Sequence, residues 1–140
     1  MEVQVNFVAV FAAVVAAMVV GMIWYSDGVF GKKWRKLEKI DEKAAKEGAM
    51  KGMIGMVVIS FLIAYTLAHV TFLSNQFYTE ASFQESAFTT AFWMWLGFIL
   101  PVLAGNSLFN QRRWKATAIH AGNWLVTVFA MALVIGAIGL

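Results

Sequence analysis

Five polar side chains have the types and positions to form a binding site, because they lie within or at the ends of long apolar stretches. Some polar residues between 117 and 127 recur at steps of three and four, so they share one face of a helix. Polar groups are costly in apolar surroundings unless they are paired. The sequence therefore predicts a polar cluster that could bind a ligand, with the candidate members Tyr25, Ser26, Asn106, His120 and Asn123.

His120 is the member of this cluster best suited to carry a proton or to bind a ligand. Imidazole titrates near neutral pH, so modest changes in its surroundings alter its charge. A second interpretation stays open, in which the five side chains only hydrogen-bond between helices and fix their register. A third is an enzyme at the membrane interface that uses His120 and Tyr25 as acid and base.

The sequence does not support other kinds of chemistry. It contains 0 Cys, which removes disulfides, thiolate metal sites and cysteine nucleophiles. No cluster of histidines and carboxylates has the spacing of metal ligands, and no glycine-rich phosphate loop or nucleophile motif is present. We therefore assign no catalytic residue, no metal and no cofactor.

Four long apolar stretches must position the candidate residues. Each exceeds the roughly 20 residues that an α-helix needs to cross a bilayer. Hydrophobic residues make up 61% of the chain and charged residues 14%, whereas a typical soluble domain has about 25% charged residues. The sequence predicts one all-α domain over residues 1–140, an integral membrane four-helix bundle. Its transmembrane helices are expected at about 3–26, 52–74, 87–110 and 116–138.

The positive charges predict the orientation of this bundle. All 11 Lys and Arg residues lie in two segments, 27–51 and 111–115, beside the apolar stretches. Cytoplasmic loops carry an excess of Lys and Arg. We therefore expect a multi-pass protein of a bacterial cytoplasmic membrane, with the basic segments in the cytoplasm and both termini outside. The net charge of +3 is explained by this pattern, so no nucleic-acid partner is expected.

Segment 32–48 is expected to form an amphipathic helix on the cytoplasmic surface of the membrane. Anionic lipids are then its expected partners, since basic residues next to a membrane helix favour them. A regulatory or partner-binding arm is the alternative. The side chains expected to contact lipid headgroups are Lys32, Lys33, Trp34, Arg35, Arg112, Arg113 and Trp114.

Three short motifs resemble those of a known family. Trp24-Tyr25-Ser26 followed by Phe30-Gly31-Lys32-Lys33-Trp34 has the form W-Y-S-x-x-x-F-G-K-x-W. The later segments Trp95–Phe98 and Ile119–Asn123 are similar to further parts of the same pattern. Together they resemble the bacterial membrane family catalogued as domain of unknown function 1761, although Asp27 stands where we expect Pro. The resemblance implies a small four-helix integral membrane protein, and it implies no activity.

These observations predict a small membrane protein that binds or transports a small molecule or ion as a homo-oligomer. A single four-helix bundle has little room for a pathway, so any pathway would need two or more copies. The alternative is a structural or accessory subunit that packs against another membrane protein or against lipid.

Overall fold

The computed structural model describes residues 2–110 and 113–140, and the regular elements found there are all helical. Four helical rods are long and apolar enough to cross a membrane, which confirms the expected all-α fold with four helices of membrane-spanning length and composition. Gln111 and Arg112 lie outside the described residues. The elements are α1 (Phe7–Trp24), α2 (Gly31–Glu38), α3 (Glu42–Phe77), α4 (Phe83–Met94), the π-helix η1 (Trp95–Ile99), α5 (Leu100–Leu108) and α6 (Trp114–Ile138).

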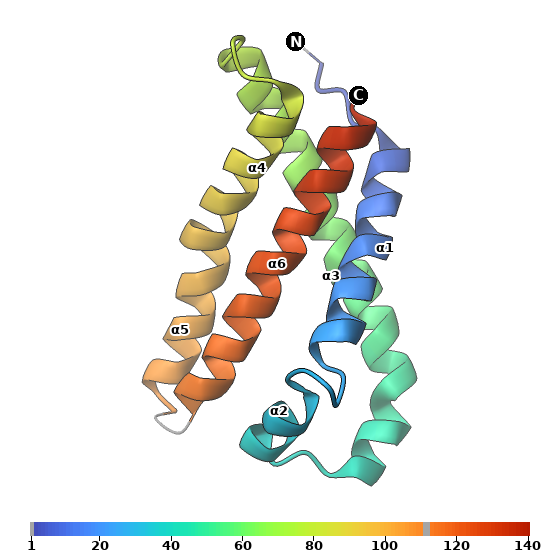
Figure 1. Ribbon diagram of the computed structural model, residues 1–140, viewed down its shortest axis with the longest axis vertical. Helices are drawn as coiled ribbons and strands as arrows, with labels where there is room; N and C mark the ends of the chain where they lie inside the picture. Colours follow the sequence, from blue (N-terminus) through green and yellow to red (C-terminus); the bar gives the residue numbers. More distant parts are fainter. Residues whose placement is uncertain (1, 111–112) are drawn as a thin grey trace.

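The four rods form a bundle in which α6 and α3 lie diagonally opposite each other. Both α6 and α3 pack mainly against α1 and α4. The two chain termini lie at one end of the bundle, and α2 lies at the other end together with the start of α6 (Figure 1). We call this second end the basic end, because the Lys and Arg residues belong to its segments.

The hydrophobic core occupies the half of the bundle near the termini. Alanines from all four rods contribute to it, among them Ala13, Ala64, Ala91 and Ala132, and each of these is almost fully buried. Small side chains let helix backbones approach closely, which is how helices associate where lipid removes the hydrophobic driving force. The dense packing therefore lies away from the basic end.

The third rod changes its helical geometry just before Pro101. The backbone N–H of Leu100 donates to the carbonyl of Trp95, five residues earlier, and a π-helix spans Trp95–Ile99. Proline lacks an N–H and clashes with the preceding turn of an α-helix, and a local π-turn is one way in which a helix accommodates it. The rod thus runs from Phe83 to Leu108 with a wide turn near its middle.

The segment expected to form one helix over 32–48 differs in the structure. α2 ends at Glu38, and Lys39 follows in the left-handed conformation with φ 51°. The Asp41 side chain then accepts a hydrogen bond from the N–H of Lys43 and begins α3. α3 continues without a break through Gly48 and Gly52 for 36 residues. Glu42 with Lys46 and Glu47 with Lys51 have the i,i+4 spacing that supports a helix through this stretch.

The first half of α3 stands apart from the bundle. From residue 42 to residue 59 every side chain is exposed, except that Gly55 is half-buried, and the first buried position is Ser60. We call residues 42–59 the free half of α3. Within the described chain, nothing lies within 4 Å of where a Cβ would stand on Gly48, Gly52 or Gly55.

The conformation of Lys39 generates a prediction about stability. A left-handed backbone costs a residue with a Cβ about 1 kcal/mol relative to glycine. Lys39→Gly should therefore raise the free energy of unfolding by about 1 kcal/mol, visible as a higher thermal midpoint in detergent. Lys36→Gly is the matched control, because a glycine inside α2 should destabilise by about 1 kcal/mol. Equal losses in both variants would contradict the conformation described for Lys39.

Candidate functional site

A tight chain reversal after α1 brings α2 back against α6. The N–H of Phe30 donates to the carbonyl of Trp24 at 3.1 Å, and the N–H of Gly31 donates to the carbonyl of Ser26 at 2.9 Å. A Cβ on Gly31 would overlap the carbonyl oxygens of Tyr25 and Ser26. Glycine is therefore required at this position, and the spacing between the two halves of the first motif follows from the reversal.

Two indole groups bind backbone carbonyls on either side of His120. Trp24 Nε1 donates to the carbonyl of Ile119 at 3.1 Å, and Trp95 Nε1 donates to the carbonyl of Ala121 at 2.9 Å. A Cβ on Gly122 would stand 3.0 Å from the Trp24 ring, so glycine lets that ring lie against α6. The second and third motifs thus meet the first on one turn of α6.

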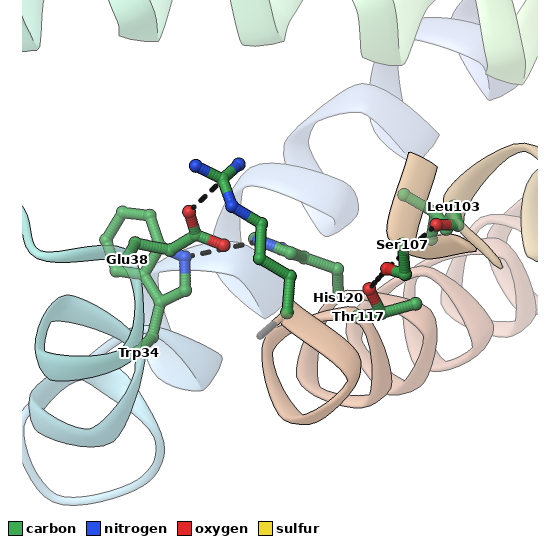
Figure 2. A network of polar contacts seen from close by, with 7 residues as sticks. Trp34, Glu38, Leu103, Ser107, Thr117 and His120 are labelled. Atoms are coloured by element: carbon green, nitrogen blue, oxygen red, sulfur yellow. Dashed lines mark hydrogen bonds and ion pairs between the residues drawn. The ribbon is translucent and has the colours of Figure 1, made fainter. Parts of the chain in front are cut away.

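The His120 imidazole is held by two aromatic side chains from other elements. Tyr25 Oη lies 2.6 Å from Nδ1, and Trp34 Nε1 lies 3.2 Å from Nε2 (Figure 2 shows the Trp34 contact). An indole N–H can only donate, so Nε2 must be the acceptor. In the neutral ring the proton then sits on Nδ1, which donates to Tyr25 Oη. This leaves the Tyr25 hydroxyl proton available for another acceptor.

A cleft of about 330 Å³ opens beside this histidine at the basic end. Its walls come from α2, from α5 and from the start of α6, and Ile40 lies on it between α2 and α3. Two opposite charges face each other across it: Glu38 Oε2 lies 3.4 Å from Arg113 Nη1. The lining residues are Trp34, Glu38, Ile40, Leu103, Asn106, Ser107, Arg113, Thr117 and His120.

The hydroxyl groups of the cleft are already paired with each other. Ser107 Oγ donates to the carbonyl of Leu103 at 3.4 Å, and the Thr117 hydroxyl bonds to Ser107 Oγ (Figure 2). Since Ser107 uses its proton on Leu103, Thr117 is the donor in the second bond. These bonds join α5 to α6. The exposed side chain of Asn106 also lines the cleft.

The five candidate site residues do not form one cluster. Tyr25 contacts His120 directly, and Asn106 lines the same cleft as His120. Ser26 instead donates its hydroxyl to the carbonyl of Ile23 at 2.7 Å and belongs to the turn after α1. Asn123 is 6% exposed and does not line the cleft, and its Nδ2 has no hydrogen-bond partner in the described part of the chain.

Glu38, a charged residue that lines the cleft, was not among the candidate site residues predicted from the sequence. Glu38 lies four residues after Trp34, so the two side chains share the face of α2 that is turned toward α6. This spacing was the available signal, but a carboxylate in a lysine-rich segment resembles an ordinary surface residue. Among the residues described, no group of three or more His, Asp and Glu side chains could hold a metal ion.

Several residues expected at lipid headgroups have partners within the protein. Trp34 points into the bundle and packs on Tyr25, with ring centres 5.1 Å apart. Arg35 pairs with Asp27, and this contact holds the pKa of the Asp27 carboxyl below its usual range. Arg113 pairs with Glu38. Of the remaining ones, Lys32, Lys33 and Trp114 are exposed, and Arg112 lies outside the described residues.

Trp34→Phe should weaken the contact between α2 and α6, because it removes the indole N–H that donates to His120. The change keeps most of the aromatic ring. One hydrogen bond contributes about 1 kcal/mol, so local opening of α2 should become about five times more frequent. Trypsin cleavage within α2 measures this, since cleavage follows the open population when reclosing is fast. Trp114→Phe is the matched control, because Trp114 is 48% exposed. An unchanged cleavage rate in Trp34→Phe would contradict the assigned contact.

Comparison with known proteins agrees with the motifs that meet at this site. The family model described as protein of unknown function, DUF1761, matches residues 8–136. No curated protein matches the chain, and neither does any solved structure. The matched range contains all three motifs, from Trp24 to the turn of α6 that holds His120. The chain therefore belongs to the DUF1761 family of proteins of unknown function.

Proposed function

We propose that this protein binds a small molecule or ion in the cleft at its basic end. The observation that carries the proposal is the cleft itself, which gathers a carboxylate, a guanidinium, an amide and two aromatic rings in about 330 Å³. Binding sites for small molecules combine a concave shape with a few convergent polar groups. Asn106 and His120 also lie inside candidate spanning helices, where polar groups tend to be functional because they are expensive to keep there.

The orientation in the membrane is part of this proposal. The basic end faces the cytoplasm of a bacterial cell and both termini face outside the cytoplasmic membrane, as the distribution of Lys and Arg predicts. The ligand would then enter from the cytoplasm or from the inner leaflet. The exposed side chains Lys32, Lys33 and Trp114 would contact anionic headgroups around the opening.

Transport would require more than one copy of the chain. The half of the bundle near the termini is filled by a tightly packed apolar core, so the cleft does not continue through a single protomer as described. A homo-oligomer would also cover the free half of α3, which a single copy leaves exposed on every face. We therefore propose binding as the primary activity and transport by a homo-oligomer as its extension.

A structural or accessory role is the second candidate function. The free half of α3 favours it, because Gly48, Gly52 and Gly55 are spaced so that another helix could approach closely. In that case a different membrane protein would cover residues 42–59. An enzymatic role is less well supported, since Tyr25 and Trp34 engage both nitrogens of His120, and neither nitrogen is left to act as a base.

Native mass spectrometry of protein released gently from its membrane tests the proposed binding. The wild-type protein should carry a bound small molecule or a lipid held by its headgroup. His120→Ala should reduce the occupancy of this ligand at least tenfold, because the change removes one wall of the cleft and the acceptor that holds Trp34 in place. Asn106→Ala should reduce the ligand occupancy about fivefold, because it removes one hydrogen bond of about 1 kcal/mol to the ligand. Asn106 is exposed, so we expect this variant to fold normally. His69→Ala, a change at the other histidine, is the control and should bind normally.

Two results would contradict the binding proposal. One is a ligand that remains bound at full occupancy in both cleft variants. The other is a wild-type species that carries no small molecule and is held to a different membrane protein, which would support the accessory role.

Reporter fusions test the proposed orientation. A fluorescent protein joined after residue 43 should fluoresce, because it would fold in the cytoplasm. Alkaline phosphatase joined after residue 140 should be active, because it would be exported. The same two reporters exchanged between the positions are the controls and should both be silent. An active cytoplasmic reporter at residue 140 would overturn the orientation.

A further inference from the structure

We infer that the ligand of the cleft is a compact zwitterion, with an ammonium group and an acidic phosphate or carboxylate group a few bonds apart. This inference rests on the proposed function, and it names the chemical class that the cleft would select. The juxtaposition that carries it is the pair of opposite charges, Glu38 and Arg113, on one small cleft with an aromatic wall.

Within the residues that the structure describes, the pair of charges leaves most of its bonding capacity unused. Glu38 Oε2 and Arg113 Nη1 are 3.4 Å apart, which is longer than the 2.7–2.9 Å or so that is usual for a charge-assisted hydrogen bond. A guanidinium has five N–H donors and a carboxylate has about four acceptor positions. A ligand that brings both a donor cation and an acceptor anion could therefore bind both groups without leaving either one unpaired.

Charge balance disfavours simpler ligands. A lone anion would draw Arg113 away and leave Glu38, which is 17% exposed, without its partner, and an unpaired charge that is mostly buried is strongly unfavourable. A lone cation would bind Glu38 but leave Arg113, which is 54% exposed, to solvent, so it would use only one of the two charges of the cleft. A zwitterion keeps the cleft neutral, since each of its charges replaces the one that it displaces.

The other lining residues divide in the same way between the two ends of such a ligand. Trp34 lies one helical turn from Glu38 on α2, and an aromatic ring next to a carboxylate is a favourable setting for an ammonium group. Asn106 can donate its amide N–H to the acid group that Arg113 binds. Leu103 and Ile40 are apolar and suit the methylene groups that join the two ends.

Two sources could supply this chemistry. The cleft lies at the basic end, where the proposed orientation places lipid headgroups, and a phosphoethanolamine headgroup is a zwitterion of this kind. A free cytoplasmic zwitterion has the same chemistry. The neutral His120 ring completes the cleft without adding a third charge, because the Trp34 indole N–H occupies its Nε2 as an acceptor.

Binding measurements compare a zwitterion with a molecule that carries only its ammonium group and with one that carries only its acid group. The full chain, in a detergent with a neutral sugar headgroup, is titrated with glycerophosphoethanolamine, whose phosphodiester carries one negative charge, with ethanolamine and with inorganic phosphate. The full chain in nanodiscs of phosphatidylglycerol, with and without phosphatidylethanolamine, gives the lipid arm. We expect glycerophosphoethanolamine to bind at least tenfold tighter than either ethanolamine or phosphate. Stabilisation by phosphatidylethanolamine alone would identify a lipid headgroup as the source. The inference is overturned if the zwitterion binds no tighter than ethanolamine or phosphate. It is also overturned if neither the free zwitterion nor phosphatidylethanolamine stabilises the protein.

Two charge-neutralising variants, each with a matched control, show which residue binds which end of the zwitterion. Glu38→Gln should lower the affinity for glycerophosphoethanolamine, or for phosphatidylethanolamine if that is the source, at least tenfold. The affinity of this variant for phosphate should be unchanged or higher. Arg113→Gln should lower the affinity for the same zwitterion at least tenfold and also lower that for phosphate. Glu47→Gln and Lys115→Gln remove exposed charges outside the cleft and should change neither. Thermal midpoints of the free variants show whether each one is folded. Losses of equal size in the control variants would overturn the inference.

The failure of this inference is distinguishable from failure of the proposed function. If native mass spectrometry finds a molecule that is not a zwitterion and that Asn106→Ala removes, binding in the cleft stands and the chemical class is wrong. If no variant of the cleft affects any bound molecule, both the function and the class are wrong.

Discussion

The architecture depends on hydrogen bonds to one turn of α6, residues 119–121, where three indole groups and a phenol from other elements meet. Trp24 ties the end of α1 to this turn, Trp34 ties α2 to it, and Trp95 ties the π-helix of the third rod to it. Helices in lipid gain little from burying apolar surface against each other, so close packing and polar contacts must hold them together. Indoles suit this role because each one combines a large apolar ring with one donor.

The two halves of the bundle are held together by different means. Near the termini, alanines bring the four rods together in a dense core. At the basic end the free half of α3 stands apart, and the short α2 packs against α6. Because α2 is only a two-turn helix, it leaves a cleft between itself, α5 and α6. The position of the cleft therefore follows from the short length of α2.

Local ion pairs determine which charges face outward. Asp27 binds Arg35, and Glu38 binds Arg113, so two of the basic side chains near the interface are used within the protein. An acidic group held nearby in the same fold competes well with a mobile headgroup, since its entropy is already lost on folding. The proposed binding activity depends on the second pair, because it is the one that lines the cleft.

The family and the four helices long and apolar enough to span a membrane could be predicted from the sequence, because length, apolarity and short motifs are properties of neighbouring residues. It also indicated Tyr25, Asn106 and His120 as residues near a common place. It could not separate these from Ser26, whose hydroxyl bonds to its own helix, or from Asn123, which lies buried outside the cleft.

The inward orientation of Glu38 and Trp34 and the helix break at Lys39 were evident only from the three-dimensional structure. The physical reason is that these features depend on how α2 docks on α6, through contacts between residues far apart in the chain. Whether a carboxylate in a basic segment meets solvent or a guanidinium across a cleft depends on that docking alone.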